Sequence, residues 1–431
     1  MTMPAWSVRS KPMWRNSVLG SAHTPISGNE RRIEVAGVPA PSLSAYLLVA
    51  AVAAVVTFAV TPLVRRLSVR LGAVAAPDER HVHTVATPRG GGAAMLVGVV
   101  GAFCVAALMD DFSDVMSART EMLGVVVAAA VIWSVGFVDD VREISAPAKV
   151  AGMVLAGGVL SMTGVSILVF RVPFFDLLFL SADWSALVTV LWVLGMATAV
   201  NLIDGLDGLA GGTVAIASGT FLLYALRLSD ADVIGPNNPG ALWACITLGV
   251  CVGFLPHNVH PARIFMGDGG ALLLGLLMAV STMSVGGRTT QEFSGQAFFF
   301  FAPIFIPLVI LGVPILDTLF AIVRRAARGG AVHAADKEHL HHQLMRIGHG
   351  HGRAVLILWM WTALLSAFVL YPTYTGKGDA VVPIGIAAFA LALYTVLHPR
   401  WGPGVTEVDE TELEALKAST NGRLKSSLRR R

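Results

Sequence analysis

The sequence predicts an all-α polytopic integral membrane protein of about eleven transmembrane helices, with the N-terminus outside and the C-terminus in the cytoplasm. Two observations lead to this fold class. Of the 431 residues, 55% are hydrophobic and only 14% are charged, whereas soluble domains carry about 25% charged residues. Apolar segments close to bilayer length also recur along most of the chain.

Eleven of these apolar segments are long enough, or nearly long enough, to cross a bilayer. In chain order they are 43–63, 93–110, 122–138, 148–168, 184–203, 208–226, 240–256, 268–285, 296–323, 354–372 and 380–398. The first is longer than the apolar core of a signal peptide and ten more follow it, so we expect no cleavage. Segment 168–183 is apolar but too short to span, which predicts an external hairpin or an interfacial piece.

Lysine and arginine are distributed unequally between the two sides of these spans. Five connecting loops and the C-terminal tail on one side hold 21 of the 31 Lys and Arg residues, while the five opposite loops hold one each. Loops rich in Lys and Arg face the cytoplasm, so we expect the tail at 399–431 to be cytoplasmic. Residues 1–42 carry five more and disagree with this orientation; their composition predicts a disordered extension ahead of the membrane domain at 43–398.

The net charge argues against nucleic-acid binding, and the cysteine content argues against disulfides and cysteine-based zinc sites. The net charge of +3 is too small to indicate a nucleic-acid-binding protein. All three cysteines, Cys104, Cys245 and Cys251, lie inside apolar runs and form no CxxC pair. We therefore expect neither a disulfide nor a zinc site built on cysteine.

Three polar side chains separate the fifth span from the sixth. Residues 198–212 read TAVNLIDGLDGLAGG, in which Asn201, Asp204 and Asp207 stand three residues apart among glycines. Carboxylates beside bilayer spans are costly and usually functional, and hard oxygen ligands suit Mg²⁺ and a phosphorylated substrate. The alternative is a plain polar turn between two helices.

The other polar motifs fall on the same basic face. They are PDERHVHTVATPRGGG at 77–92, FVDDVREISAPAK at 137–149, FLPHNVHPARIFMGDGG at 254–270, Asp317 near the inner end of the ninth span, and ADKEHLHHQLMRIGHGHGR at 335–353. Such convergence is unexpected for unrelated structural residues, so the loops predict one cytoplasmic site.

The charged residues at the span ends each have two interpretations. Asp139 and Asp140 form either a solvated helix end or a pair that needs a metal or cationic partner, because adjacent carboxylates repel. Lys149 is either a lysine that reaches the interface or a phosphate contact. Asp268 in GDGG is either a helix N-cap or a metal ligand.

A histidine-rich segment completes the predicted site. His339, His341 and His342 lie near Arg346, which favours contact with an anionic sugar phosphate over a zinc site, since no cysteine or HExxH motif accompanies them. A plain surface histidine run is the other alternative. We expect His349, His351 and Arg353 to form a basic flank at the membrane surface.

Together these motifs closely resemble the polyprenyl-phosphate N-acetylhexosamine-1-phosphate transferases, and more narrowly the bacterial UDP-N-acetylglucosamine:polyprenyl-phosphate branch, whose acceptor is undecaprenyl or decaprenyl phosphate. The resemblance covers about residues 45–398. It is carried, in order, by PDERHVHTVATPRGGG, VDDVREI, NLIDGLDGLAGG, ARIFMGDGGALLLG and HLHHQL. It implies a bacterial plasma-membrane enzyme with its active site on the cytoplasmic face.

The resemblance also implies residue roles. The catalytic residues would be Asp139, Asp140, Asp204, Asp207 and Lys149. The substrate-binding residues would be Asp207, near the uracil, with His339, His341, His342, Arg346, Arg80 and His83. The metal ligands would be Asn201 and Asp268, holding Mg²⁺, for which Mn²⁺ could substitute.

Two departures from the family pattern stand out. Relatives often read Arg-Lys-x-His where this chain has Arg80-His81-Val82-His83, which puts a phosphate contact there in doubt. Glu143 in the DDxxE motif differs from the lysine typical of the phospho-muramoyl-pentapeptide branch, which favours the N-acetylglucosamine branch.

The implied reaction transfers N-acetylglucosamine 1-phosphate (GlcNAc-1-phosphate) from UDP-GlcNAc to a polyprenyl phosphate and releases UMP. Another UDP-sugar, such as UDP-MurNAc-pentapeptide, is an alternative donor. A secondary transporter is a remote alternative, because transporter carboxylates cluster near the bilayer midplane. A phosphate monoester is mostly dianionic at neutral pH, which favours direct displacement over a covalent aspartyl intermediate. The partners implied are UDP-GlcNAc, a polyprenyl phosphate and the membrane, with the chain acting alone or as a homodimer.

Overall fold

A computed structural model divides the chain into Met1–Val38 and Pro39–Arg431. The residues that it describes all belong to the second unit. They are 40–72, 74–75, 87–171, 177–287, 312, 315, 343–345, 347–375 and 381–397. The tail 399–431, all of the predicted span 296–323 except residues 312 and 315, and all but the end of the extension 1–42 therefore fall outside them, and these boundaries stay predictions.

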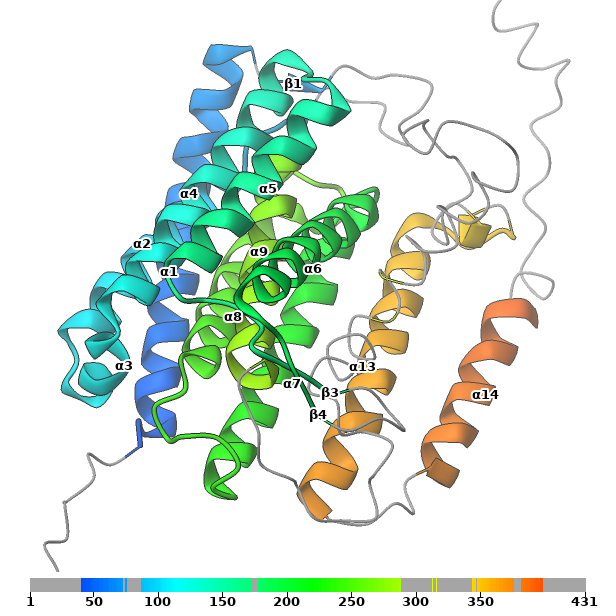
Figure 1. Ribbon diagram of the computed structural model, residues 1–431. Helices are drawn as coiled ribbons and strands as arrows, with labels where there is room; N and C mark the ends of the chain where they lie inside the picture. The colour runs from blue at the N-terminus through cyan, green and yellow to red at the C-terminus, as the bar shows by residue number, and fades with distance from the viewer. Residues whose placement is uncertain are drawn as a thin grey trace, which may run out of the picture. The chain divides into compact units, whose positions relative to one another are not determined.

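The described residues are mostly helical (Figure 1). The helices are α1 Leu43–Leu71, α2 Gly92–Leu108, the 3-10 helix η1 Asp110–Phe112, α3 Ser113–Ser117, α4 Arg119–Arg142, α5 Ala146–Met162, α6 Ala182–Ile203, α7 Leu209–Asp230, α8 Pro239–Asn258, α9 Gly267–Gly286, α13 His351–Thr375 and α14 Val381–Leu397. Each predicted span that lies within the described residues corresponds to one of these helices. For most of the span ends, the predicted and observed boundaries differ by only a few residues.

Seven of these helices are long and apolar enough to cross a membrane: α1, α4, α6, α7, α8, α9 and α13. An eighth span is formed if α2 is counted with η1 and α3, from which it is bent by 95°. Helices α5 and α14 are apolar but shorter. A mostly helical, polytopic membrane protein is thus confirmed, whereas the count of eleven spans and the orientation of the termini stay predictions.

Helix α9 is the centre of the packing. Every residue from Gly269 to Gly286 is buried, and α9 contacts α2, α4, α6, α7 and α8. Glycines allow this close approach, because a Cβ on Gly275 would lie 2.5 Å from the Ala197 Cα of α6. In membrane proteins small residues at helix interfaces let backbones pack closely. The N-terminus of α9 is thereby held at a fixed place among its neighbours.

Local sequence signals explain several helix ends. The Ser42 hydroxyl accepts a hydrogen bond from the Ala45 amide at 3.2 Å and caps α1, which ends at Gly72 with a left-handed φ of 74°. Asn238 caps α8 through the Gly240 amide at 2.8 Å, and Pro239 occupies the first helical position. Asn and Ser at N-caps and Pro at the first position are the expected choices.

Two short antiparallel ribbons accompany the helices. β1 Val74–Ala75 pairs with β2 Thr87–Pro88, and β3 Val169–Arg171 pairs with β4 Leu177–Phe179. The second ribbon lies within the apolar segment 168–183 and confirms a hairpin there. The amides of Leu168 and Val169 bond to the Gly287 carbonyl oxygen at the end of α9, so this ribbon lies at the opposite end of α9 from Asp268.

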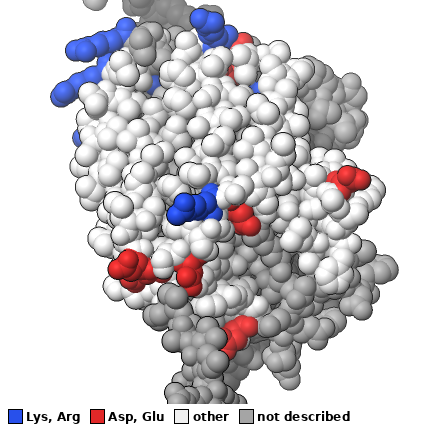
Figure 2. Space-filling view, turned by 60° about the vertical axis from the view of Figure 1, so that its left-hand side comes forward, with Lys and Arg blue, Asp and Glu red and all other residues white. Residues whose placement is uncertain are grey.

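Charged groups are sparse between the two ends of the helices. On the face that Figure 2 shows, Lys and Arg gather at the top and Asp and Glu lie mostly lower down, while the surface between them is largely uncharged apart from a small charged patch near its middle. Large apolar side chains are exposed along α1, among them Leu48, Val55 and Phe58. Such a surface suits contact with lipid.

Candidate functional site

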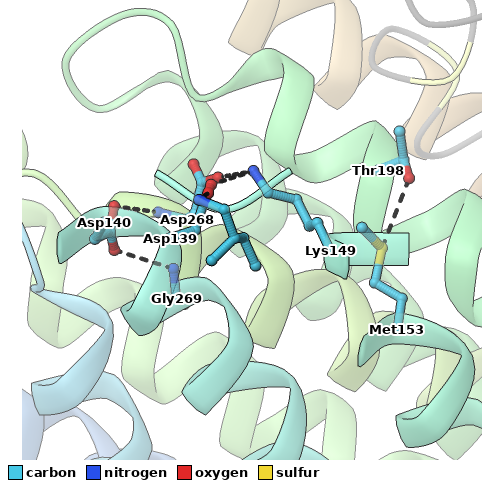
Figure 3. Close-up of polar contacts among 8 residues, drawn as sticks. Asp139, Asp140, Lys149, Met153, Thr198, Asp268 and Gly269 are labelled. Carbon is cyan, nitrogen blue, oxygen red and sulfur yellow. Dashed lines mark hydrogen bonds and ion pairs between the residues drawn. The ribbon is translucent and has the colours of Figure 1, made fainter. Parts of the chain in front are cut away.

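Asp140 joins the end of α4 to the start of α9. Its carboxylate accepts hydrogen bonds from the Asp268 amide at 3.0 Å and from the Gly269 amide at 3.3 Å (Figure 3). The first amides of a helix have no partner within the helix and attract negative charge. Asp140 therefore caps α9 from a neighbouring helix and fixes where the GDGG segment begins.

Two glycines make this junction possible. A Cβ on Gly136, one turn before Asp140, would lie 2.5 Å from the Gly269 backbone of α9. Gly267 has φ +71°, and a Cβ there would lie 2.3 Å from the Asp140 carboxylate. Both positions lack the space for any side chain, and the positive φ favours glycine.

Lys149 of α5 pairs with two carboxylates. Its ammonium contacts Asp139 at 2.5 Å and also forms an ion pair with Asp268 (Figure 3). The second oxygen of Asp139 accepts the Ile144 amide at 2.8 Å. All three charged side chains are at most 30% exposed. Lys149 thus neutralises part of the negative charge that α4 and α9 bring together.

The turn between α6 and α7 carries Asp204 and Asp207. Its last residue, Gly208, has a left-handed φ of 78°, and its amide donates to the Asn258 side-chain oxygen at 3.0 Å. The Asn258 amide nitrogen donates in turn to the Ile264 carbonyl oxygen at 3.1 Å. A single buried asparagine therefore connects this turn to the loop between α8 and α9.

Asp207 is directed into protein rather than into solvent. Its side chain is fully buried, and its Oδ2 accepts hydrogen bonds from His260 Nδ1 at 2.7 Å and from the Ala262 amide at 3.1 Å. The Asp207 amide donates to His351 Nε2 at 3.0 Å. The prediction of a basic surface flank is wrong for His349 and His351, whose rings pack inside the protein.

A cavity of about 190 Å³ opens beside the turn. Four aspartates and one arginine contribute charged groups to its wall, and an amide and an aromatic ring supply uncharged ones. The lining residues are Arg89, Asp140, Asp204, Gly205, Leu206, Asp207, Asn258, Phe265, Gly267 and Asp268. They come from five separate segments of the chain, and the predicted convergence of the loops is therefore observed.

The electrostatics of the cavity act most strongly on Asp204. Burial of its carboxyl, together with the nearby charges of Asp268, Asp140 and Asp207, raises its pKa well above the ordinary value, while Arg89 opposes the shift. Charged forms are disfavoured when they lose water and when like charges surround them. This carboxyl holds its proton more tightly than an exposed aspartate until a cation approaches.

The predicted site residues differ in where they lie. Asp140, Asp204, Asp207 and Asp268 line the cavity, and Asp139 and Lys149 lie behind Asp268. Asn201 lies one turn before Asp204 in α6 and is not among the lining residues. The residues that fall outside the described part of the chain are Arg80, His83, His339, His341, His342, Arg346 and Asp317.

Sequence reasoning missed four residues of this site. Arg89 and Phe265 line the cavity, Asn258 positions the turn, and His260 bonds Asp207. Arg89 and Phe265 lie in the PRGGG and RIFMGDGG segments, which were recognised as motifs without these roles. The β2 carbonyl oxygen of Pro88 accepts the Phe265 amide at 2.9 Å, which brings the two loops together. The pairing of these two loops brings both residues to one cavity, which neither motif predicts by itself.

Comparison with known proteins agrees with these motifs. Residues 122–286 match the family described as glycosyl transferase family 4. The chain is 37% identical over 377 residues to a decaprenyl-phosphate N-acetylglucosaminephosphotransferase of Mycolicibacterium smegmatis, covering 85% of this chain and 91% of the relative. It is 35% identical to a probable undecaprenyl-phosphate N-acetylglucosaminyl 1-phosphate transferase of Bacillus subtilis, covering 72% and 81%. A phospho-N-acetylmuramoyl-pentapeptide-transferase of Desulforudis audaxviator is 34% identical, covering 75% and 97%.

Proposed function

The chain belongs to the family of polyprenyl-phosphate N-acetylglucosamine-phosphate transferases. We propose that it transfers GlcNAc-1-phosphate from UDP-GlcNAc to a polyprenyl phosphate. The products are polyprenyl-diphospho-GlcNAc and UMP. Decaprenyl phosphate is the first acceptor to test, because the Mycolicibacterium relative is named for it.

The cavity is the observation that carries this proposal. A nucleoside diphosphate sugar needs a flat apolar surface and hydrogen-bonding groups for the base, and positive charge for the phosphates. Phe265, Asn258 and the turn at Leu206 supply the first set of groups, and Arg89 supplies a guanidinium that can bind phosphate oxygens in pairs. Arg89 is the only basic residue among the lining residues.

The donor set also fits a divalent cation. Four aspartates line one small cavity together with a single arginine, and this excess of negative charge would repel a diphosphate. Carboxylate oxygens are the ligands that Mg²⁺ prefers, and it binds through one or two of them together with substrate phosphates. Asp204 and Asp268 would hold Mg²⁺, which when bound would neutralise phosphate charge; Asn201 stays a predicted ligand. Mn²⁺ could substitute.

The chemistry proposed is a direct displacement. A phosphate oxygen of the lipid attacks the β-phosphorus of UDP-GlcNAc, and the bond from that phosphorus to the bridging oxygen breaks, so that UMP leaves with the oxygen. Positioning and charge stabilisation dominate phosphoryl transfer. We propose that Lys149 orients Asp268 and limits the repulsion between Asp268 and Asp139. The pair formed by Asp139 and Asp140 would accept the residual proton of the lipid phosphate.

The position of the site suits substrates of opposite solubility. The carboxylates lie at the ends of apolar helices, where a water-soluble nucleotide sugar and a lipid phosphate can both arrive. We infer that this end faces the cytoplasm of a bacterial cell, because the loops there carry most of the Lys and Arg residues.

Product identification tests the proposal. Membranes containing the protein are incubated with decaprenyl or undecaprenyl phosphate, Mg²⁺ and UDP-GlcNAc labelled in the sugar and the β-phosphate. Both labels should enter one lipid product, with release of UMP, and Asp268→Ala should abolish the transfer. Asp183→Ala provides a matched control. Asp183 is an exposed aspartate in the first turn of α6, at the end of that helix opposite to the turn that carries Asp204. Transfer from UDP-MurNAc-pentapeptide alone would establish the alternative donor.

A further inference from the structure

Asp207 belongs to a cluster that includes two histidines distant in sequence. His260 lies in the loop between α8 and α9, and His351 is the first residue of α13. Their rings stack with centroids 4.3 Å apart and planes inclined by 24°. The His260 side chain is 47% exposed, whereas that of His351 is only 7% exposed. One ring is therefore accessible to water and the other is enclosed.

The hydrogen bonds define which nitrogen of each ring acts. A backbone amide can only donate, so His351 Nε2 accepts from Asp207 and the proton of this neutral ring is on Nδ1. An ionised carboxylate can only accept, so His260 Nδ1 is the donor to Asp207 Oδ2. The two histidines have opposite roles: His351 holds the backbone of Asp207 and His260 holds its side chain.

A metal site is the competing interpretation of the same three residues, since their ligand atoms lie within 4.8 Å of one another. The geometry argues against it. Asp207 Oδ2 and His260 Nδ1 are 2.7 Å apart, a hydrogen-bond distance, whereas two ligands of tetrahedral zinc, each about 2.0–2.1 Å from the metal, lie more than 3 Å apart. A metal also lies in the plane of each imidazole that binds it, and two nearly parallel stacked rings do not share such a point nearby.

We propose that His260 and His351 are positioning residues that fix the turn between α6 and α7 for the sugar nucleotide. This inference rests on the proposed function. Asp204, Gly205 and Leu206 of that turn line the cavity. The two histidines bind its last aspartate, Asp207, from positions 53 and 144 residues further along the chain. The start of α13 thereby becomes part of the nucleotide site.

Substitution of His260 and of His351 by asparagine and by glutamine tests the proposal. The asparagine side chain ends near the δ position of a histidine ring, and the glutamine side chain reaches the ε position. His260→Asn keeps a donor in place and His260→Gln does not; at position 351 the order is reversed, because His351→Gln keeps the acceptor. The KM for UDP-GlcNAc should stay near the wild-type value in His260→Asn and His351→Gln. It should rise about tenfold, the worth of one hydrogen bond, in His260→Gln and His351→Asn, with a smaller change in kcat and in the KM for the lipid.

A substitution of a third histidine, His257, serves as the control. His257→Asn should leave both KM values unchanged, because His257 Nε2 contacts the Phe58 carbonyl oxygen of α1 and not the turn. The same ranking of Asn and Gln at both positions, or an equal rise in the KM for the lipid, would overturn the proposal. Thermal midpoints with and without UDP separate folding from nucleotide binding. Should the misplaced isosteres not fold, loss of UDP stabilisation in folded His260→Asn or His351→Gln would also overturn it.

A failure of the proposed function gives a different result. If the wild-type protein makes no polyprenyl-diphospho-GlcNAc, the proposed function is wrong. If the wild type makes this product but the variants show no reversal, the proposed function stands and only the positioning role is wrong.

Discussion

A methyl group at Gly136 should damage both stability and activity. In Gly136→Ala, the new Cβ would lie 2.5 Å from the backbone of Gly269 in α9. Ordinary van der Waals contact begins at about 3.4 Å, so the two helices must separate by about 0.9 Å. The neighbouring atoms are backbone and cannot rotate away. Overpacking of this kind costs about 1–3 kcal/mol.

The separation acts directly on the site. Asp140, one turn after Gly136, would be drawn from the amides of Asp268 and Gly269 that it caps. A misplacement of about 1 Å can lower a rate by about 100-fold, so we expect kcat to fall by about 10- to 100-fold, together with a lower thermal midpoint in detergent.

The matched control for this substitution is Gly158→Ala in the neighbouring helix α5. A Cβ on Gly158 would have no atom within 4 Å, so this variant should keep the wild-type kcat and thermal midpoint. Unchanged activity and stability in purified Gly136→Ala would refute the close α4–α9 contact, and with it the role given to Asp140. Equal losses in both variants would show that alanine affects the helices for reasons unrelated to this contact.

Three further predictions concern the charged groups of the cavity. Arg89→Gln should raise the KM for UDP-GlcNAc about 10-fold or more, since charged hydrogen bonds contribute about 1.5–3 kcal/mol, and Arg89→Lys should recover part of it; equal KM values in initial-rate assays would exclude the phosphate contact. Lys149→Met and Asp268→Asn should together lower kcat by less than the product of their separate effects, because the two groups form one ion pair; additive losses would contradict the pairing. The raised pKa of Asp204 means that the folded, metal-free protein binds more protons than the unfolded chain above about pH 4. Its stability should therefore fall as the pH rises through that raised pKa, while Mg²⁺ affinity increases, and Asp204→Asn should remove both trends in thermal-shift titrations.

The sequence predicted the helices well because each apolar run has a physical length set by the bilayer. It also grouped Asp139, Asp140, Lys149 and Asp268, since each stands at a span end on one face. It did not reveal the bend after α2, where the chain turns through 95° at a Met-Asp-Asp sequence that has no proline or glycine.

Other site residues could not be recognised for a different reason. His351 appeared to be one of several basic residues beside the membrane, because nothing local shows that its ring accepts the amide of a residue 144 positions earlier. Arg89 likewise gains its role only from the pairing of two loops. Such roles arise from tertiary contacts and leave no periodic pattern in the sequence.

The site combines two kinds of support that respond differently to perturbation. The α4–α9 junction is rigid, since glycines bring two helix backbones into contact and Asp140 caps one from the other. The turn with Asp204 is instead held by side-chain hydrogen bonds from Asn258, His260 and His351. Individual hydrogen bonds of this kind contribute only about 0.5–1.5 kcal/mol each, so loss of one should displace the turn while the helices of the junction stay in contact. Variants of the junction should therefore act mainly on kcat, and variants of the turn mainly on the KM for UDP-GlcNAc.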